Sequence, residues 1–311
     1  MNGPPAALLP TETQSPLKEN EPNVSAIQKR TPKSALLIAA GVATVALVIG
    51  SGISVFAQNG MVTQPQMNNL EQAELLKAGE ANYTKHCAGC HGVNGDGHGP
   101  ASRWLNPKPR DFRDGVFKFR STPSGSLPTE GDLMRTLTAG LVGTSMPSWH
   151  LVPERERYAL VKYIKTFSTL WEDPTALKTP ISLPPAPENL NSPESVYAGR
   201  LVYEKNGCVQ CHGDGGQGDG PSANALNDQW GFHVKPANFV RGRLRGGDTP
   251  TDIYRTFTTG VNGTPMPAYK DDLTEEQRWD LVSYVSSLRR GETPHPANPA
   301  GESAPAPAGQ K

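Results

Sequence analysis

The chain has 311 residues, with 30 basic and 30 acidic side chains and a formal net charge of zero. This balance argues against nucleic acid or an acidic polymer as the partner. The length suffices for about two ordinary domains, and the 32 glycines and 30 prolines predict loop-rich domains with irregular connections.

The N-terminal region predicts a tail followed by a membrane anchor. Residues 1–33 are polar and proline-rich without periodicity, which is typical of a disordered tail on the cytoplasmic side. Residues 34–57 contain no charged side chain, and a helix of about 23 residues spans about 34 Å, enough to cross a bilayer core. Basic residues crowd the N-terminal side of this segment and none follows it until Lys77. The positive-inside rule therefore places everything after residue 57 outside the cytoplasm.

A cleaved signal peptide is the alternative interpretation of 34–57, with Val55-Phe56-Ala57 as a passable cleavage site. The apolar stretch is longer than the usual apolar core of a signal peptide, about 7–15 residues, and the preceding segment is long. We therefore favour an uncleaved anchor. Either interpretation exports the rest of the chain.

A first repeated unit is expected over 71–170, after a polar spacer at 58–70. It begins with an amphipathic helix over 70–85, and the matching helix of the second unit begins at Ser192, a typical N-cap followed by proline. Glycine and tyrosine recur at equal places in the two helices: Gly79 and Tyr83, then Gly199 and Tyr203. Such a glycine either permits close helix packing or is a tolerated surface residue.

Each first helix leads into a C-x-x-C-H motif. Cys87, Cys90 and His91 form the first motif, and the second follows 121 positions later, with Cys208, Cys211 and His212. This motif is the attachment signature of c-type haem, in which two thiols form thioethers and the histidine binds the iron. All four cysteines of the chain lie in these motifs. We therefore predict two covalently bound haem c groups.

Three other uses of C-x-x-C are the alternatives to haem attachment. A tetrahedral zinc site wants four ligands, usually from two paired clusters, whereas each cluster here is closed by its own histidine. A thioredoxin-like redox pair does not require that histidine. A structural disulfide fits an exported protein, but it does not explain the doubled motif or the downstream methionines.

A methionine follows each motif at nearly the same distance and is the expected sixth iron ligand. Met146 lies 55 residues after His91, and Met266 lies 54 residues after His212. A thioether stabilises ferrous iron and raises the reduction potential. The rivals in the first unit are Met134, His98 and His150, and core packing is the alternative role of any one methionine.

Other matching segments complete the two units. Glycine-rich loops follow both histidines, and a carbonyl in such a loop could accept the hydrogen bond of the proximal imidazole. Residues 108–112 match residues 235–239 at an offset of 127, which is larger than the offset of 121 between the two motifs. This difference predicts a longer loop around Trp230 in the second unit. A middle helix and a closing helix follow in each unit. The remaining segments are a proline-rich linker at 171–191 that lets the units move, a second unit at 192–290 and a disordered tail at 291–311.

On these motifs the chain resembles class I cytochrome c twice over, across roughly 70–170 and 193–290. The glycine-rich loop followed by Pro-Arg-Asp-Phe is similar to that of membrane-bound di-haem cytochromes of bacterial respiratory chains. The resemblance implies an all-α fold, with two tandem haem domains behind a single N-terminal transmembrane helix in the bacterial cytoplasmic membrane, and with the haem domains on the periplasmic side. It also implies that His91 and Met146 bind one iron and that His212 and Met266 bind the other. The resemblance further suggests that the carbonyls of Pro100 and Pro221 accept hydrogen bonds from the two histidines. Arg110, a residue that could meet a haem propionate, is replaced by Ala237 in the second unit, where Arg241 or Arg243 could take its place.

The expected function is electron transfer without catalysis, because both irons would have two protein ligands and no open position for a substrate. The expected partners are redox proteins in or on the membrane, namely a donor complex and an oxidase or soluble acceptor. Two alternatives stay open: a di-haem peroxidase, and a permanent cytochrome c subunit of a larger respiratory complex.

Overall fold

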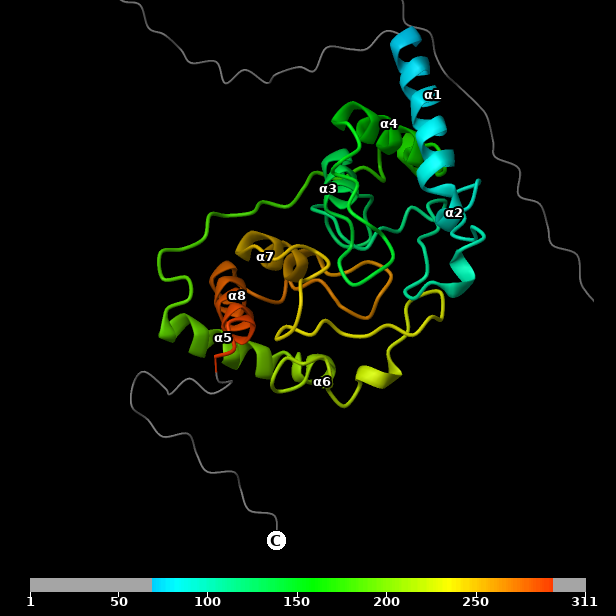
Figure 1. Ribbon diagram of the computed structural model, residues 1–311. Coiled ribbons are helices and arrows are strands. Elements are labelled where there is room, and N and C mark those ends of the chain that lie inside the picture. Colours follow the sequence, from blue (N-terminus) through cyan, green and yellow to red (C-terminus); the bar gives the residue numbers. More distant parts are fainter. Residues whose placement is uncertain (1–68, 293–311) are drawn as a thin grey trace, which may run out of the picture. The chain divides into compact units, whose positions relative to one another are not determined.

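The computed structural model describes residues 69–292 (Figure 1). These residues form helices and loops, and their only β-type pairing is an isolated bridge between Asn227 and His233. The expected all-α class is therefore confirmed for this part of the chain. The expected tail at 1–33, the anchor at 34–57 and the spacer up to residue 68 lie outside the described residues, as does the expected C-terminal tail at 291–311 after residue 292. No helix within 69–292 has the length and apolar character needed to cross a membrane.

The same order of helices occurs twice, and we call the two sets the first and second repeat. The helices of the first repeat are α1 (Asn69–His86), α2 (Ala88–His91), α3 (Glu130–Ala139) and α4 (Glu154–Lys165). Those of the second repeat are α5 (Pro193–Lys205), α6 (Val209–His212), α7 (Pro250–Thr259) and α8 (Glu275–Arg289). Short 3₁₀ turns lie between them, at Ser102–Trp104, Thr169–Glu172 and Ala223–Ala225.

Side-chain caps fix where several helices begin. Thr129, Thr249 and Thr274 each form a capping box, in which the threonine hydroxyl accepts from a backbone N–H three residues on. The side chain at that third position bonds back to the threonine N–H. The Ser192 hydroxyl caps α5 by accepting from the N–H of Ser195, without the reciprocal bond, ahead of Pro193. These caps satisfy N–H groups that the helix itself leaves unpaired.

The first and last helices of each repeat cross at a glycine. A methyl group on Gly79 of α1 would lie 2.3 Å from the carbonyl oxygen of Ala159 in α4. A methyl group on Gly199 of α5 would lie 1.9 Å from the carbonyl oxygen of Asp280 in α8. Both separations are far below contact distance. Of the two interpretations of these glycines, the structure supports close helix packing.

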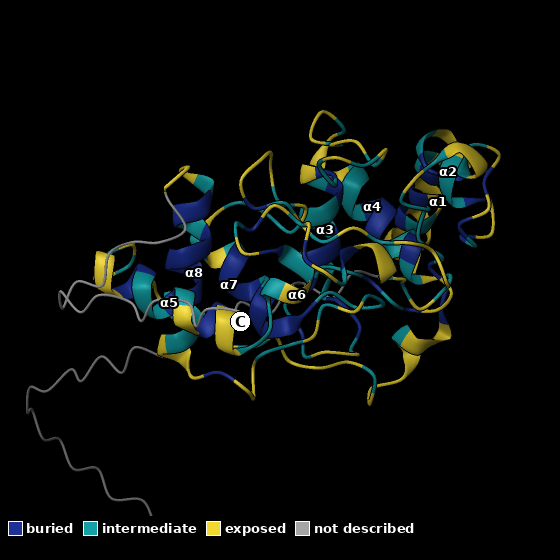
Figure 2. Cartoon of the chain, turned by 90° about the horizontal axis from the view of Figure 1, so that it is seen from below, coloured by how far each residue is buried: buried dark blue, intermediate teal, exposed yellow. Residues whose placement is uncertain are grey.

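Each repeat has its own hydrophobic core beside that crossing. In Figure 2 the helices α7 and α8 are largely dark blue, which marks their buried residues. Val282 and Val285 of α8 are fully buried, as are Leu160 and Val161 of α4. The cores are built from two separate clusters of buried side chains. Each repeat therefore has a hydrophobic core of its own.

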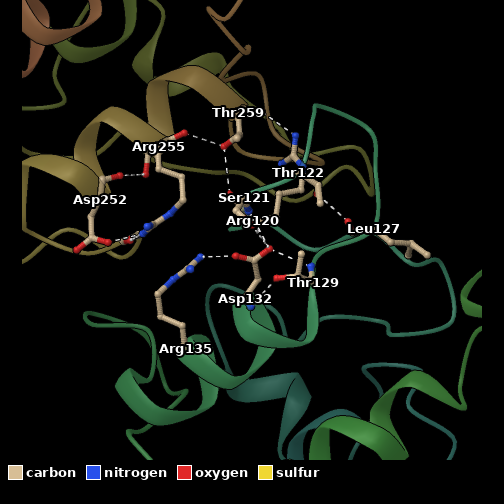
Figure 3. A network of polar contacts seen from close by, with 12 residues as sticks. Arg120, Ser121, Thr122, Leu127, Thr129, Asp132, Arg135, Asp252, Arg255 and Thr259 are labelled. Atoms are coloured by element: carbon tan, nitrogen blue, oxygen red, sulfur yellow. Dashed lines mark hydrogen bonds and ion pairs between the residues drawn. The ribbon is translucent and has the colours of Figure 1, made fainter. Parts of the chain in front are cut away.

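The two repeats are joined by a buried polar contact (Figure 3). The side chain of Arg120 in the first repeat is only 1% exposed. Its Nη2 donates to the carbonyl oxygen of Thr259 at 2.7 Å, and its Nε donates to that of Pro123 at 3.1 Å. Nearby, the backbone N–H of Gly125 donates to Oδ1 of Asn262 at 3.1 Å. A buried arginine bonded to the other repeat ties the two together.

The longer excursion of the second repeat also reaches the first repeat. Nε1 of Trp230 donates to Oδ2 of Asp114 at 2.8 Å. The guanidinium carbon of Arg110 lies 3.7 Å from the centroid of a Trp230 ring, a cation–π contact. The extra residues that the sequence predicted around Trp230 therefore form part of the junction between the repeats.

The linker is fixed to both repeats, which differs from the expectation of mobile units. The N–H of Ile181 donates to the carbonyl of Ser121 at 2.7 Å. At its other end, the N–H of Asn191 donates to the hydroxyl of Ser283 at 3.0 Å. Composition predicted a semi-stiff spacer, but hydrogen bonds to the first repeat at one end and the second at the other hold it in place.

Candidate haem-binding sites

A largely apolar cavity lies beside the C-x-x-C-H motif of each repeat. Cys87, Cys90, His91 and Met146 all line the first cavity. The second cavity is lined by their counterparts Cys208, Cys211, His212 and Met266. The structure thus brings the eight predicted site residues together in two groups of four. Large apolar side chains form much of the walls, among them Phe112, Leu133 and Ile164 in the first cavity and Phe239, Phe257 and Val285 in the second.

One helical turn presents each motif to its cavity. The N–H groups of Cys90 and His91 donate to the carbonyl of Cys87 at 3.0 and 2.9 Å. The N–H groups of the second motif repeat this pattern on Cys208, at 3.3 and 2.9 Å. A turn of this kind places two thiols and one imidazole on the same side of the backbone. Such a set matches the two vinyl groups and the iron of a single haem.

The four thiols are unpaired. Burial, together with the neighbouring Cys90, raises the pKa of the Cys87 thiol to about 12. Burial likewise raises the pKa of the Cys208 thiol to about 11, against the opposing hydrogen bond with Tyr269. A redox-active C-x-x-C needs a lowered thiol pKa, so this environment does not suit a thioredoxin-like pair. Within residues 69–292, no group of three or more His, Cys, Asp or Glu side chains has an arrangement that would hold a metal ion by itself.

A backbone carbonyl orients each motif histidine. Nδ1 of His91 lies 3.0 Å from the carbonyl oxygen of Arg110, and Nδ1 of His212 lies 3.0 Å from that of Ala237. A carbonyl only accepts, so Nδ1 carries the proton and Nε2 keeps a free lone pair. Burial lowers the pKa of both imidazoles, although the carbonyl bond acts in the opposite direction. The result is a neutral imidazole, the form that binds iron.

The carbonyl partners implied by the resemblance, Pro100 and Pro221, are not the acceptors. The glycine-rich loop instead brings a later segment to the histidine. In the first repeat the N–H of Phe112 donates to the carbonyl of Gly95 at 2.7 Å, and the Phe112 ring stacks on His91 at 4.5 Å between centroids. The second repeat has the same arrangement around Phe239 and His212.

A buried tyrosine on the first helix of each repeat supports the glycine-rich loop. The hydroxyl of Tyr83 donates to the carbonyl oxygen of Gly92 at 2.7 Å. The hydroxyl of Tyr203 donates to that of Gly213, also at 2.7 Å. Each accepting glycine directly follows a motif histidine. The tyrosine therefore links the helix crossing to the backbone that carries the imidazole.

The methionine loops are built alike. The carbonyl of Met146 accepts from the N–H of Leu141 at 3.0 Å, and its N–H donates to the hydroxyl of Thr144 at 3.1 Å. Met266 has the equivalent bonds at 3.1 and 3.3 Å. Gly140 has a φ of 68°, and a methyl group on it would lie 2.5 Å from the backbone of Pro147. A tight loop thus holds each sulfur-bearing residue at its cavity.

The rival ligands of the first repeat lie elsewhere. His98 is exposed and bonded to Asp96, and His150 is exposed beside Ser148. Met134 packs against the core without lining the cavity. Sequence reasoning missed His86, which lines the first cavity and lies 5.1 Å from the ring of Trp149. Its position next to Cys87 was the only signal available.

The cavity walls also carry positive charge. Arg110 lines the first cavity, whereas Arg241 and Arg243 line the second. Burial lowers the pKa of Arg110 to about 10, against the opposing attraction of nearby carboxylates such as Asp228 and Asp114. Cations at these places suit the carboxylate side chains of a haem.

Residues 76–168 and 196–289 each match the family described as cytochrome c, and together they make up more than half of the chain. The chain belongs to the cytochrome c family. The double match shows two cytochrome c domains, and with them two covalently bound haem c groups. The donor set found here fits that cofactor, since each apolar cavity offers two thiols, a neutral imidazole and a thioether.

Curated relatives and a solved structure extend the comparison. The cbb3-type cytochrome c oxidase subunit FixP of Sinorhizobium medicae is 34% identical over 110 residues, which cover 32% of this cytochrome and 33% of that protein. The subunit CcoP of Helicobacter pylori is 25% identical over 238 residues, or 73% of this chain and 63% of that one. This cytochrome therefore spans less than two thirds of either relative. A chain in the reducing HAO-like protein complex of Kuenenia stuttgartiensis is 42% identical, with a TM-score of 0.66, over 68% of this chain and 96% of that chain.

Proposed function

We propose that this cytochrome is the di-haem electron-transfer subunit of a bacterial respiratory complex, in which another subunit carries out catalysis. The observation that carries the proposal is the presence of both a histidine and a methionine at each cavity. Two protein ligands leave an iron no open position for substrate. The names of the relatives, which are subunits of oxidases and a chain of a multi-protein complex, support membership of a larger assembly.

The residues of each cavity take separate roles in this proposal. The two thiols of each motif would attach the porphyrin, Nε2 of His91 and of His212 would hold the iron, and the thioethers of Met146 and Met266 would be its second protein ligands. The carbonyls of Arg110 and Ala237 hold the imidazoles in place. The stacked Phe112 and Phe239 rings help to keep water away. Haem c supplies a one-electron iron couple, which the thioether ligand shifts toward the reduced state.

The site assignment is tested by haem content and by spectroscopy. The pyridine haemochrome assay should give two haems per chain, and Cys87→Ala or Cys211→Ala should each weaken or abolish the retention of one. The ferric protein should show the weak near-infrared sulfur-to-iron charge-transfer band. We expect half of this band to disappear in Met146→Ala and half in Met266→Ala. Met134→Ala is the matched control, and an unchanged band in Met146→Ala would contradict the assignment.

The proposal includes anchoring by residues 34–57, with both haem domains on the periplasmic side. The charge asymmetry around that segment supports this orientation. A reporter fused after residue 292 should be active only if it is of a kind that works outside the cytoplasm. Activity of a reporter that works only in the cytoplasm would contradict the proposed orientation.

Membership of a complex is tested in native membranes. A tagged chain solubilised in mild detergent should co-purify with its catalytic subunit in a fixed ratio that survives high salt. A mobile carrier would instead be released, because its contacts with partners are transient and salt-sensitive. Release as a single species at moderate salt would favour the mobile carrier.

A further inference from the structure

Two basic residues at equivalent positions lie on the walls of both haem cavities. Lys118 follows Phe112 by six positions, and Arg245 follows Phe239 by six. Each of the two residues lines the first cavity and also the second. The other cavity cations line only one, with Lys108 and Arg110 in the first and Lys235, Arg241 and Arg243 in the second.

The segments that carry these residues contact each other. Phe119 also lines both cavities. A methyl group on Gly246 would lie 3.1 Å from Cδ1 of Phe119, so the absence of a side chain at residue 246 lets the aromatic ring approach. Lys118, Phe119 and Arg245 therefore form one wall shared by the two cavities.

The charges of the shared wall lack direct partners. Within residues 69–292 no hydrogen bond or ion pair engages the side chain of Lys118 or Arg245. By contrast, Nζ of Lys108 donates to the carbonyls of Ser102 and Arg103 at 3.0 and 3.1 Å. A protein wall with unpaired cations suits a ligand that brings negative charge.

The environment of Lys118 shows how close these cations are. Burial, together with the positive charges of Arg110 and Arg245, lowers the pKa of Lys118 to about 8, while Asp228 acts in the opposite direction. Three cations of two repeats thus act on one another. An anion placed among them would relieve this repulsion.

Haem c has two propionate carboxylates, and this chain has two cytochrome c domains, each with one proposed haem cavity. Carboxylates pair well with lysine and with the planar guanidinium of arginine. We infer that Lys118 and Arg245 form a shared cation bridge, which binds propionate groups of the haems in both repeats and raises the reduction potential of both. The inference rests on the haem sites proposed above. A positive charge near an iron favours the ferrous state, so loss of either cation should lower both potentials.

Spectroelectrochemical titration of the full chain tests the bridge. Lys118→Met and Arg245→Met should each lower both haem potentials, and Lys118→Arg should keep them near the wild-type values. Lys108→Met is the control for the first cavity and Arg241→Met for the second, and each should move one potential only. Met146→His and Met266→His assign the potentials, since each changes the ligand of one iron.

A shift of only one potential in both Lys118→Met and Arg245→Met would overturn the shared bridge, as would no shift in either. Arg245 is exposed, so its replacement leaves the core intact and keeps the test valid if Lys118→Met folds poorly. The haem count per chain is measured separately on the wild-type protein. Fewer than two haems there would refute the proposed sites, whereas two haems with unshifted potentials would refute the bridge alone.

Discussion

Substituting Gly199 by alanine should strain the crossing of α5 and α8. The added methyl carbon would lie 1.9 Å from the carbonyl oxygen of Asp280 and 2.4 Å from its carbon. Ordinary contact needs about 3.5 Å, so the two backbones must separate by about 1.1–1.6 Å. Alanine gains about 1 kcal/mol in helix propensity, whereas overpacking costs about 1–3 kcal/mol and more where backbone atoms clash.

We expect a net loss of about 2 kcal/mol in the free energy of unfolding, which corresponds to about 4–8 °C in Tm for a protein of this size. Thermal unfolding followed by far-UV circular dichroism measures it. Gly131→Ala in α3 is the matched control, because the nearest atom to its added methyl is 3.6 Å away. Gly79→Ala should fall between the two, since its clash is milder at 2.3 Å. If Gly199→Ala proves as stable as Gly131→Ala, α5 and α8 do not pack at the described distance.

Three other changes test the site and the junction. Tyr203→Phe removes the donor to the carbonyl of Gly213 and should lower stability by about 1–3 kcal/mol, measured by urea titration with Tyr197→Phe as control. Burial tends to raise the pKa of Asp132, but hydrogen bonds from Ser121 and Thr129 and the charge of Arg135 hold it below its usual 3.8. Its stabilisation is therefore complete above 3.8 and is lost as the pH falls through the lower folded-state value. In Asp132→Asn, the free energy of unfolding should therefore fall less steeply as the pH is lowered through this range. An unchanged pH dependence would contradict the role given to Asp132. Trp230→Ala removes the contacts with Asp114 and Arg110 and should speed proteolysis within 171–191, whereas Trp104→Ala, at an exposed tryptophan, should not.

The groups of residues at each cavity could be predicted because their signals are local or repeated. A C-x-x-C-H motif occupies one helical turn, so its sequence alone determines which side chains lie together. Met146 and Met266 are distant from their motifs, but the near-equal spacing in two copies singled them out. The capping residue Ser192 was also readable, because a helix start depends on few neighbours.

Contacts made by the backbone could not be predicted in this way. The carbonyl that holds each histidine belongs to Arg110 in one repeat and Ala237 in the other, two side chains with nothing in common. Since any residue supplies a carbonyl, no residue type marks this position. The prolines expected from the family resemblance were wrong for this reason.

Contacts between the repeats were also hidden from the sequence. The change of offset revealed an excursion around Trp230, but not its partner Asp114, which lies 116 positions away. Charge and composition likewise gave no reason to pair Arg120 with the carbonyl of Thr259. Such pairings depend on how two folded surfaces meet, which periodicity and spacing within each unit do not encode.

The bonded junction between the repeats also affects the rate of electron flow. Two freely swinging haem carriers would have to collide before an electron could pass between them, and that search would limit throughput. Arg120 and Trp230 tie the two repeats to each other. In the proposed electron-transfer role, this junction would keep the two haems at one separation and remove the search. The subunit would then conduct between a bound donor and a bound acceptor without shuttling between them.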